Sequence, residues 1–200
     1  KAAVSANVTA QQVIDNYAAA LGGKSKLEAV KTVKTLSTIK VMGMEMEATT
    51  LEMAPNKSKA VQKIMGQEMV QVFDGEKGYM MQAGQRMDLP APAIEEAKKK
   101  RLFEVLSYNP ADFKTVEKVT EEGKELYLLA GAGKKLYFDT KTNLLVKSTS
   151  DKGDMVILDY MEVDGIKFPK NLKLAMMGQN MEMTNNQVIV NKEVSAEDFK

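Results

Sequence analysis

The 200-residue sequence contains no cysteine, no histidine and no tryptophan. Without cysteine it cannot form disulfides, thiolate metal sites or iron–sulfur clusters, and it has no thiol nucleophile. Without histidine it lacks the commonest general base and the commonest metal ligand. Because most catalytic arrangements are thereby excluded, we expect a protein that is not an enzyme, with no cofactor and no metal site.

The chain also lacks a strong charge of either sign and a long apolar run. Its 28 Lys and Arg residues nearly cancel its 27 Asp and Glu residues, and the formal net charge is +1. This balance offers no electrostatic footprint for nucleic acid or for an anionic membrane. No stretch approaches the roughly 18 consecutive apolar residues that span a bilayer. Because the sequence starts at Lys1 and not at Met, we expect a processed or trimmed chain, so that any export signal would lie outside it.

Three segments have the pattern of helices. In residues 9–21, Thr9 and Gln12 have the spacing of a capping box, and two glycines follow the last apolar position. Residues 24–30 are a second, shorter candidate. A third helix is expected over 92–106, because prolines precede it, its apolar residues recur at helical spacing, and an Asn-Pro pair follows.

Most of the remaining sequence has strand character, interrupted by turn signals such as Asp74-Gly75, Glu122-Gly123, Lys152-Gly153 and Asp164-Gly165. Strands and helices do not alternate regularly, so a doubly wound parallel sheet is disfavoured. The length fits one domain over 1–200. The prediction is an α+β fold in which one large curved antiparallel sheet carries about three helices.

Methionine is the unusual residue of this chain, with 15 copies. Three segments repeat the pattern Met-Gly-x-x-Met between strand-like runs, beginning at Met42, Met65 and Met177. Glycine at that position is typical of a hairpin turn that needs a positive φ. The glycines therefore predict three hairpins, but they do not explain the methionines beside them.

The methionines near these turns follow the alternation of a strand. Met42, Met44 and Met46 share one face, and Met181 and Met183 repeat the pattern on a second strand. Methionine is flexible and polarizable, and it recurs on surfaces that accept many apolar partners. An adaptable apolar cavity is one hypothesis; a core filled by the methionines is another. A third is soft-metal binding, since thioethers hold Cu(I) and the pairs have Met-x-Met spacing.

Other candidate sites are weaker. In the basic run 98–101, Lys99 and Lys100 stand four residues after Glu95 and Glu96, as expected for a solvated helix face with i,i+4 ion pairs. Residues 74–78 lack both the acidic spacing of an EF-hand and the ending of a P-loop, and they predict a hairpin turn. Nothing in the sequence places a carboxylate pair such as Asp151 and Asp154 in a cleft.

Several sequence segments, taken together, resemble those of a known protein family. Residues 9–17 running into 20–24, then 72–79, 137–147 and 159–169 resemble, in order and spacing, the outer-membrane lipoprotein-sorting (LolA/LolB-like) superfamily. That resemblance implies a strongly curved antiparallel half-barrel whose concave side is covered by helices and encloses an apolar cavity for acyl chains. It also implies an exported, periplasmic protein.

The expected function is therefore non-catalytic binding or carriage of a lipid or of a lipoprotein acyl chain by a monomer. A structural or interaction module of the cell envelope with a self-filled core is the alternative, and a Met-based copper or silver binder is the third possibility. Partners would be a lipid, an acylated lipoprotein or an envelope protein, and not nucleic acid. The predicted cavity lining is Met44, Met46, Met69, Phe73, Met181 and Met183, with Leu102 and Val105 on the covering helix.

Overall fold

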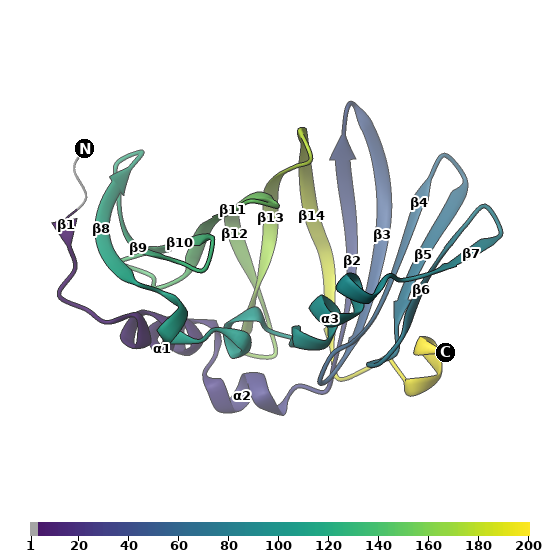
Figure 1. Ribbon diagram of the computed structural model, residues 1–200, viewed down its shortest axis with the longest axis horizontal. Helices are drawn as coiled ribbons and strands as arrows, with labels where there is room; N and C mark the ends of the chain where they lie inside the picture. Colours follow the sequence, from purple (N-terminus) through teal and green to yellow (C-terminus); the bar gives the residue numbers. More distant parts are fainter. Residues whose placement is uncertain (1–3) are drawn as a thin grey trace.

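A single 14-stranded sheet dominates the computed structural model, which describes residues 4–200 (Figure 1). Its first half along the chain consists of β1 (Val4–Ser5), β2 (Thr32–Val41), β3 (Met44–Met53), β4 (Lys57–Ile64), β5 (Gln67–Phe73), β6 (Gly78–Gln82) and β7 (Gln85–Asp88). The second half consists of β8 (Thr115–Glu121), β9 (Lys124–Gly131), β10 (Lys134–Asp139), β11 (Leu145–Ser150), β12 (Gly153–Val163), β13 (Ile166–Met176) and β14 (Gln179–Val190).

All neighbouring strands pair antiparallel, in the order β1-β8-β9-β10-β11-β12-β13-β14-β2-β3-β4-β5-β6-β7. The meander is continuous except where β14 returns beside β2 and where β1 pairs with β8. The sheet curves without closing, and β1 and β7 are its two edges (Figure 1). The predicted α+β class with a curved antiparallel sheet is confirmed.

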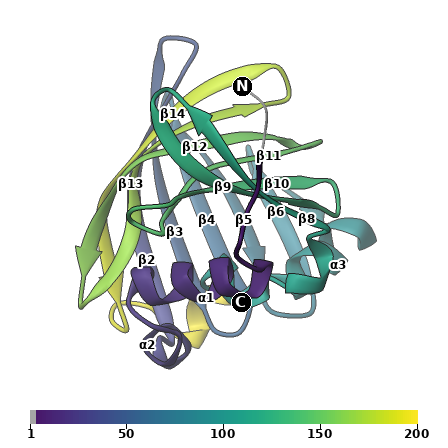
Figure 2. The same cartoon turned by 90° about the vertical axis from the view of Figure 1, so that its left-hand side faces the viewer.

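The helices lie together near one end of the strands, whereas the β2–β3 turn points the other way (Figure 1). They are α1 (Ala10–Leu21), α2 (Lys24–Ala29), α3 (Ala91–Lys99) and the short 3-10 helices η1 (Glu104–Ser107), η2 (Pro110–Asp112) and η3 (Ala196–Phe199). Figure 2 shows α1 running across this end of the sheet. The capping box is confirmed: the Gln12 amide donates to Thr9 Oγ1 at 3.1 Å, and the Thr9 amide donates to Gln12 Oε1 at 2.9 Å. No helix among residues 4–200 has both the length and the apolar character that crossing a membrane requires.

The prediction of one helix over 92–106 is wrong. The backbone leaves helical geometry at Lys100, so Leu102 lies in the connection and Val105 in η1, not on α3. Phe103 and Val105 are both buried in the core. A helix that continued to residue 106 would place their side chains outside this core. The Asn56 side chain donates to the Lys98 carbonyl oxygen at 3.1 Å and thereby caps the shortened helix.

The strand register defines two faces of the sheet. Ile39 of β2 pairs with Met46 of β3, so both side chains lie on the same face. The pairings of β3 with β4 and of β4 with β5 place Phe73 of β5 on that face as well. Val33 shares this face with Ile39 and is part of the core that α1 buries. We call this side the inner face and the opposite side the outer face.

The inner face divides into two unequal parts. From β8 to β14 and β2 it packs against α1 in one hydrophobic core, in which the rings of Tyr17 and Phe138 meet edge to face at 5.2 Å. The five strands β3–β7, residues 44–88, contribute no residue to that core; we call them the wing. On the outer face of the wing η3 covers Val72, and the Tyr79 hydroxyl donates to the Lys200 carbonyl oxygen at 2.9 Å. The inner face of the wing therefore lacks a helical core of its own.

The three Met-Gly segments form the predicted hairpin turns. Met42, Met65 and Met177 have φ of 52°, 49° and 52°, and the following glycines are also positive. Both central residues of such a turn need positive φ, for which glycine and asparagine are preferred to methionine. Met42 thus belongs to the turn and not to the strand face on which it was predicted, and its side chain is exposed.

Candidate functional site

Most of the methionines lie on the inner face. Strand pairing and packing against the core place ten of them there: Met44, Met46, Met69, Met80, Met87, Met155, Met161, Met176, Met181 and Met183. In the wing they alternate with polar residues, because Gln62, Gln71 and Gln82 share their face. The inner face of the wing is therefore a soft, amphipathic surface and not a closed apolar core.

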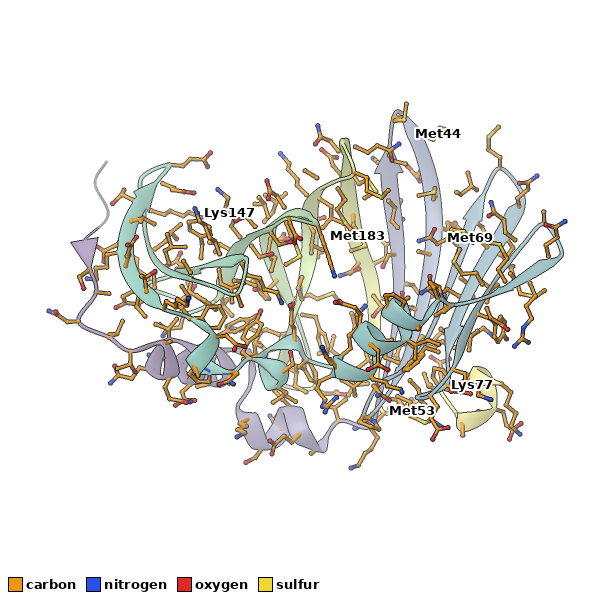
Figure 3. All side chains as sticks on the ribbon, in the orientation of Figure 1. Met44, Met53, Met69, Lys77, Lys147 and Met183 are labelled. Atoms are coloured by element: carbon orange, nitrogen blue, oxygen red, sulfur yellow. The ribbon has the colours of Figure 1, made fainter. Side chains whose placement is uncertain are left out.

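The predicted lining residues occupy this face with different exposures. Met46 is buried at 8% exposure, whereas Met44 is exposed at 45%, near the β2–β3 turn; Met69, Met181 and Met183 are half-buried. Figure 3 shows Met44 near the turn end of β3 and Met53 at its opposite end. The structure brings Phe73 and Leu102 together in one cavity, while Val105 packs in the core under α1.

That cavity lies between α3 and the inner face of β3–β5 and has a volume of about 280 Å³. Its apolar lining consists of Pro55, Phe73, Leu89, Ala93, Ala97 and Leu102. Phe73 is only 2% exposed, because the side of α3 that carries Ala93 and Ala97 lies over it. No residue of α3 is itself buried, so few apolar contacts hold the helix in place.

Charged side chains also line this cavity. Glu52, Lys100 and Arg101 line it, together with Glu96 and Lys152. Burial raises the pKa of Glu52 to about 7, an effect that the nearby Lys100 partly opposes. The Lys152 ammonium bonds the Glu96 carboxylate at 2.9 Å, which raises the lysine pKa and lowers that of the glutamate. This ion pair ties α3 to the β11–β12 turn.

Sequence reasoning missed these polar residues. The basic run was interpreted as a solvated helix face, but Glu95 pairs with Lys98 at 3.5 Å and Glu96 pairs with Lys152, so the i,i+4 pairs are wrong. Lys100 lies beyond the helix end and faces the cavity instead. A signal was present in β3, where Glu52 has the same parity as Met44 and Met46.

Two further cavities lie elsewhere. One of about 520 Å³ lies between η3 and the wing and includes Tyr79 and Arg86, whose guanidinium stacks 3.9 Å from the tyrosine ring centre. Another of about 440 Å³ lies beside Leu126 and Val146, which belong to a small second hydrophobic cluster. Neither contains a residue of the predicted lining.

Three tyrosines in the core, Tyr17, Tyr108 and Tyr160, are the other notable polar groups. Burial raises the pKa of Tyr17 to about 12 and raises the pKa values of Tyr108 and Tyr160 as well. The Tyr160 hydroxyl donates to the Leu145 carbonyl oxygen at 2.6 Å. These phenols remain protonated and serve packing and hydrogen bonding. Residues 4–200 contain no group of three His, Cys, Asp or Glu side chains that could hold a metal ion.

Known structures share this architecture. A protein of the DUF1329 family from Desulfovibrio piger matches over 96% of this chain and 97% of its own, with a TM-score of 0.60 and 8% sequence identity. A putative outer membrane lipoprotein-sorting protein domain from Vibrio parahaemolyticus matches over the same shares, with a TM-score of 0.59 and 8% identity. The chain has a LolA-like fold. No protein-family model matches the LolA-like chain, and no curated protein matches it in sequence. At such low identity the likeness concerns the fold alone.

Proposed function

We propose that this LolA-like protein binds a long apolar ligand, such as the acyl chain of a lipid or lipoprotein, and that it does so without catalysis. The ligand lies on the inner face of the wing, and α3 with the following segment to Ser107 covers it. The observation that carries the proposal is the gathering of methionines on one face of strands that lack a core of their own.

Burial of the chain supplies the affinity. Each buried methylene contributes about 0.8 kcal/mol, so eight of them contribute about 6 kcal/mol before the cost of ordering the ligand. The flexible methionine side chains suit ligands of several lengths, because they refill space that a shorter chain leaves. The lipoprotein-sorting name of one structural neighbour supports an acylated ligand and a periplasmic location.

A second candidate is a module of the cell envelope that binds a protein. The core under α1 favours it, because α1 fills that half of the inner face with its own side chains, and α1 lines none of the three cavities described above. In this case the wing and its cover would be a protein-docking surface with no lipid.

Titration with a fluorescent fatty-acid probe distinguishes the two. We expect a saturable signal with one probe per chain, and displacement of the probe by unlabelled dodecanoate. A protein that binds no probe at micromolar concentration, while remaining folded by circular dichroism, would refute the ligand-binding proposal and leave the interaction module.

A further inference from the structure

The cavity under α3 differs chemically from the rest of the inner face. Its lining combines apolar side chains such as Phe73 and Leu102 with the charged side chains of Glu52, Lys57, Lys100 and Arg101, which we call the polar wall. A pure hydrocarbon ligand would gain nothing from the polar wall and would have to desolvate it. The composition fits a ligand with a polar head and an apolar chain.

Three cations of the polar wall, Lys57, Lys100 and Arg101, take part in no ion pair among residues 4–200. Lys152, by contrast, pairs with Glu96. One guanidinium nitrogen of Arg101, Nη1, donates to the carbonyl oxygens of Lys98 and Lys100 at 3.3 and 2.8 Å. These bonds fix the guanidinium at the end of α3 and leave its other donors available.

The acidic residues of the wall oppose these cations only in part. Glu96 is neutralised by Lys152. Glu52 takes part in no ion pair of the described residues, and burial disfavours its ionised form at neutral pH. The uncompensated charge on this wall is therefore positive.

We propose that the cavity under α3 binds the anionic headgroup of the apolar ligand, a carboxylate or a phosphate, through Lys100 and Arg101, while the chain passes Phe73 and Leu102 onto the inner face. This inference rests on the proposed function and adds the class of headgroup. A planar guanidinium binds either anion through paired hydrogen bonds, and the lysine adds a point charge.

Glu52 makes this binding dependent on pH. The charged groups that face it across the cavity are Lys57, Lys100, Arg101 and Lys152, with Glu96 beyond them. When Glu52 ionises, its negative charge repels the bound anion; when it is protonated, the repulsion disappears. Affinity for an anion should therefore fall as the pH rises from 6 to 8, and Glu52→Gln should remove most of this dependence.

The test compares dodecanoate with dodecanol, which has the same chain length but no charge, by calorimetric titration at pH 6, 7 and 8. We expect the wild type to bind dodecanoate about tenfold more tightly than dodecanol at pH 6, and Lys100→Gln to reduce this ratio about threefold. Lys99→Gln is the matched control: it removes the same charge from the same exposed segment, but Lys99 does not line the cavity, so the ratio should not change.

The outcomes separate the two proposals. Equal affinity for dodecanoate and dodecanol, or an equal effect of both lysine variants, would overturn the headgroup site while leaving apolar binding intact. Failure of both ligands to bind would refute the proposed function itself. Dodecyl phosphate and inorganic phosphate complete the series: tighter binding of dodecyl phosphate than of dodecanoate identifies phosphate as the preferred head. Inorganic phosphate binding as tightly as dodecyl phosphate would contradict a site that joins head and chain.

Discussion

Replacing Phe138 with alanine should lower the free energy of unfolding by about 3–5 kcal/mol. Phe138 is 1% exposed, contacts Tyr17 of α1 edge to face, and lies where the sheet and α1 share their core. The truncation leaves a cavity between elements that cannot both close around it. Urea denaturation followed by circular dichroism measures the change.

Phe113→Ala is the control for this prediction. The Phe113 side chain is half-buried at the rim of the same core and meets Tyr108 with ring centres 6.3 Å apart, so its loss should cost less than half as much. A loss below about 1 kcal/mol for Phe138→Ala would show that the core under α1 is not the stabilising centre of the molecule.

Replacing Met69 with lysine should weaken binding of the neutral ligand dodecanol at least tenfold. Met69 lies half-buried on the inner face of β5, where an apolar chain would contact it, and an ammonium group there must lose water when the chain binds. One order of magnitude corresponds to about 1.4 kcal/mol, well within the cost of desolvating a charge. Calorimetric titration measures the affinity.

Met81→Lys is the matched control, because Met81 lies on the adjacent strand β6 with its side chain on the outer face. The substitution adds the same charge one strand away, and we expect less than a twofold change in affinity. If the two variants weaken binding equally, the ligand does not lie on the inner face of the wing.

Local signals in the sequence predicted the elements whose geometry is decided locally. The capping box of α1 and the Met-Gly hairpins depend on residues within a few positions of one another, and both have the predicted geometry. The pairing of consecutive strands followed from the turns, because antiparallel strands joined by short turns lie side by side. The pairings of β14 with β2 and of β1 with β8 join distant segments and were not predicted.

The end of α3 could not be predicted in the same way. Residues 98–101 are good helix formers, and nothing local stops the helix before the Asn-Pro pair. The backbone turns at Lys100 because Phe103 and Val105 enter a core built mainly by distant strands. Tertiary packing overrides local propensity here, and it places Lys100 and Arg101, which remain exposed to solvent, beside the cavity and not on the helix.

The polar part of the candidate site depends on the same long-range packing. The alternation of β3 placed Met44 and Met46 on one face, and it also placed Glu52 there, but only the position of α3 shows that this half-buried carboxyl lines a cavity. Met65 and Met177, at the tips of two hairpin turns, are 90% and 96% exposed. Ligand binding on the inner face does not explain why methionine stands at these two positions.

Native mass spectrometry of the protein purified from its own host shows directly whether an apolar ligand is bound. We expect a complex of one chain with one acyl-containing, anionic lipid, which organic extraction releases and fragmentation identifies. A spectrum that shows only the bare chain, both after this purification and after incubation with excess dodecanoate, would contradict the claim that the methionine-lined face binds an apolar ligand.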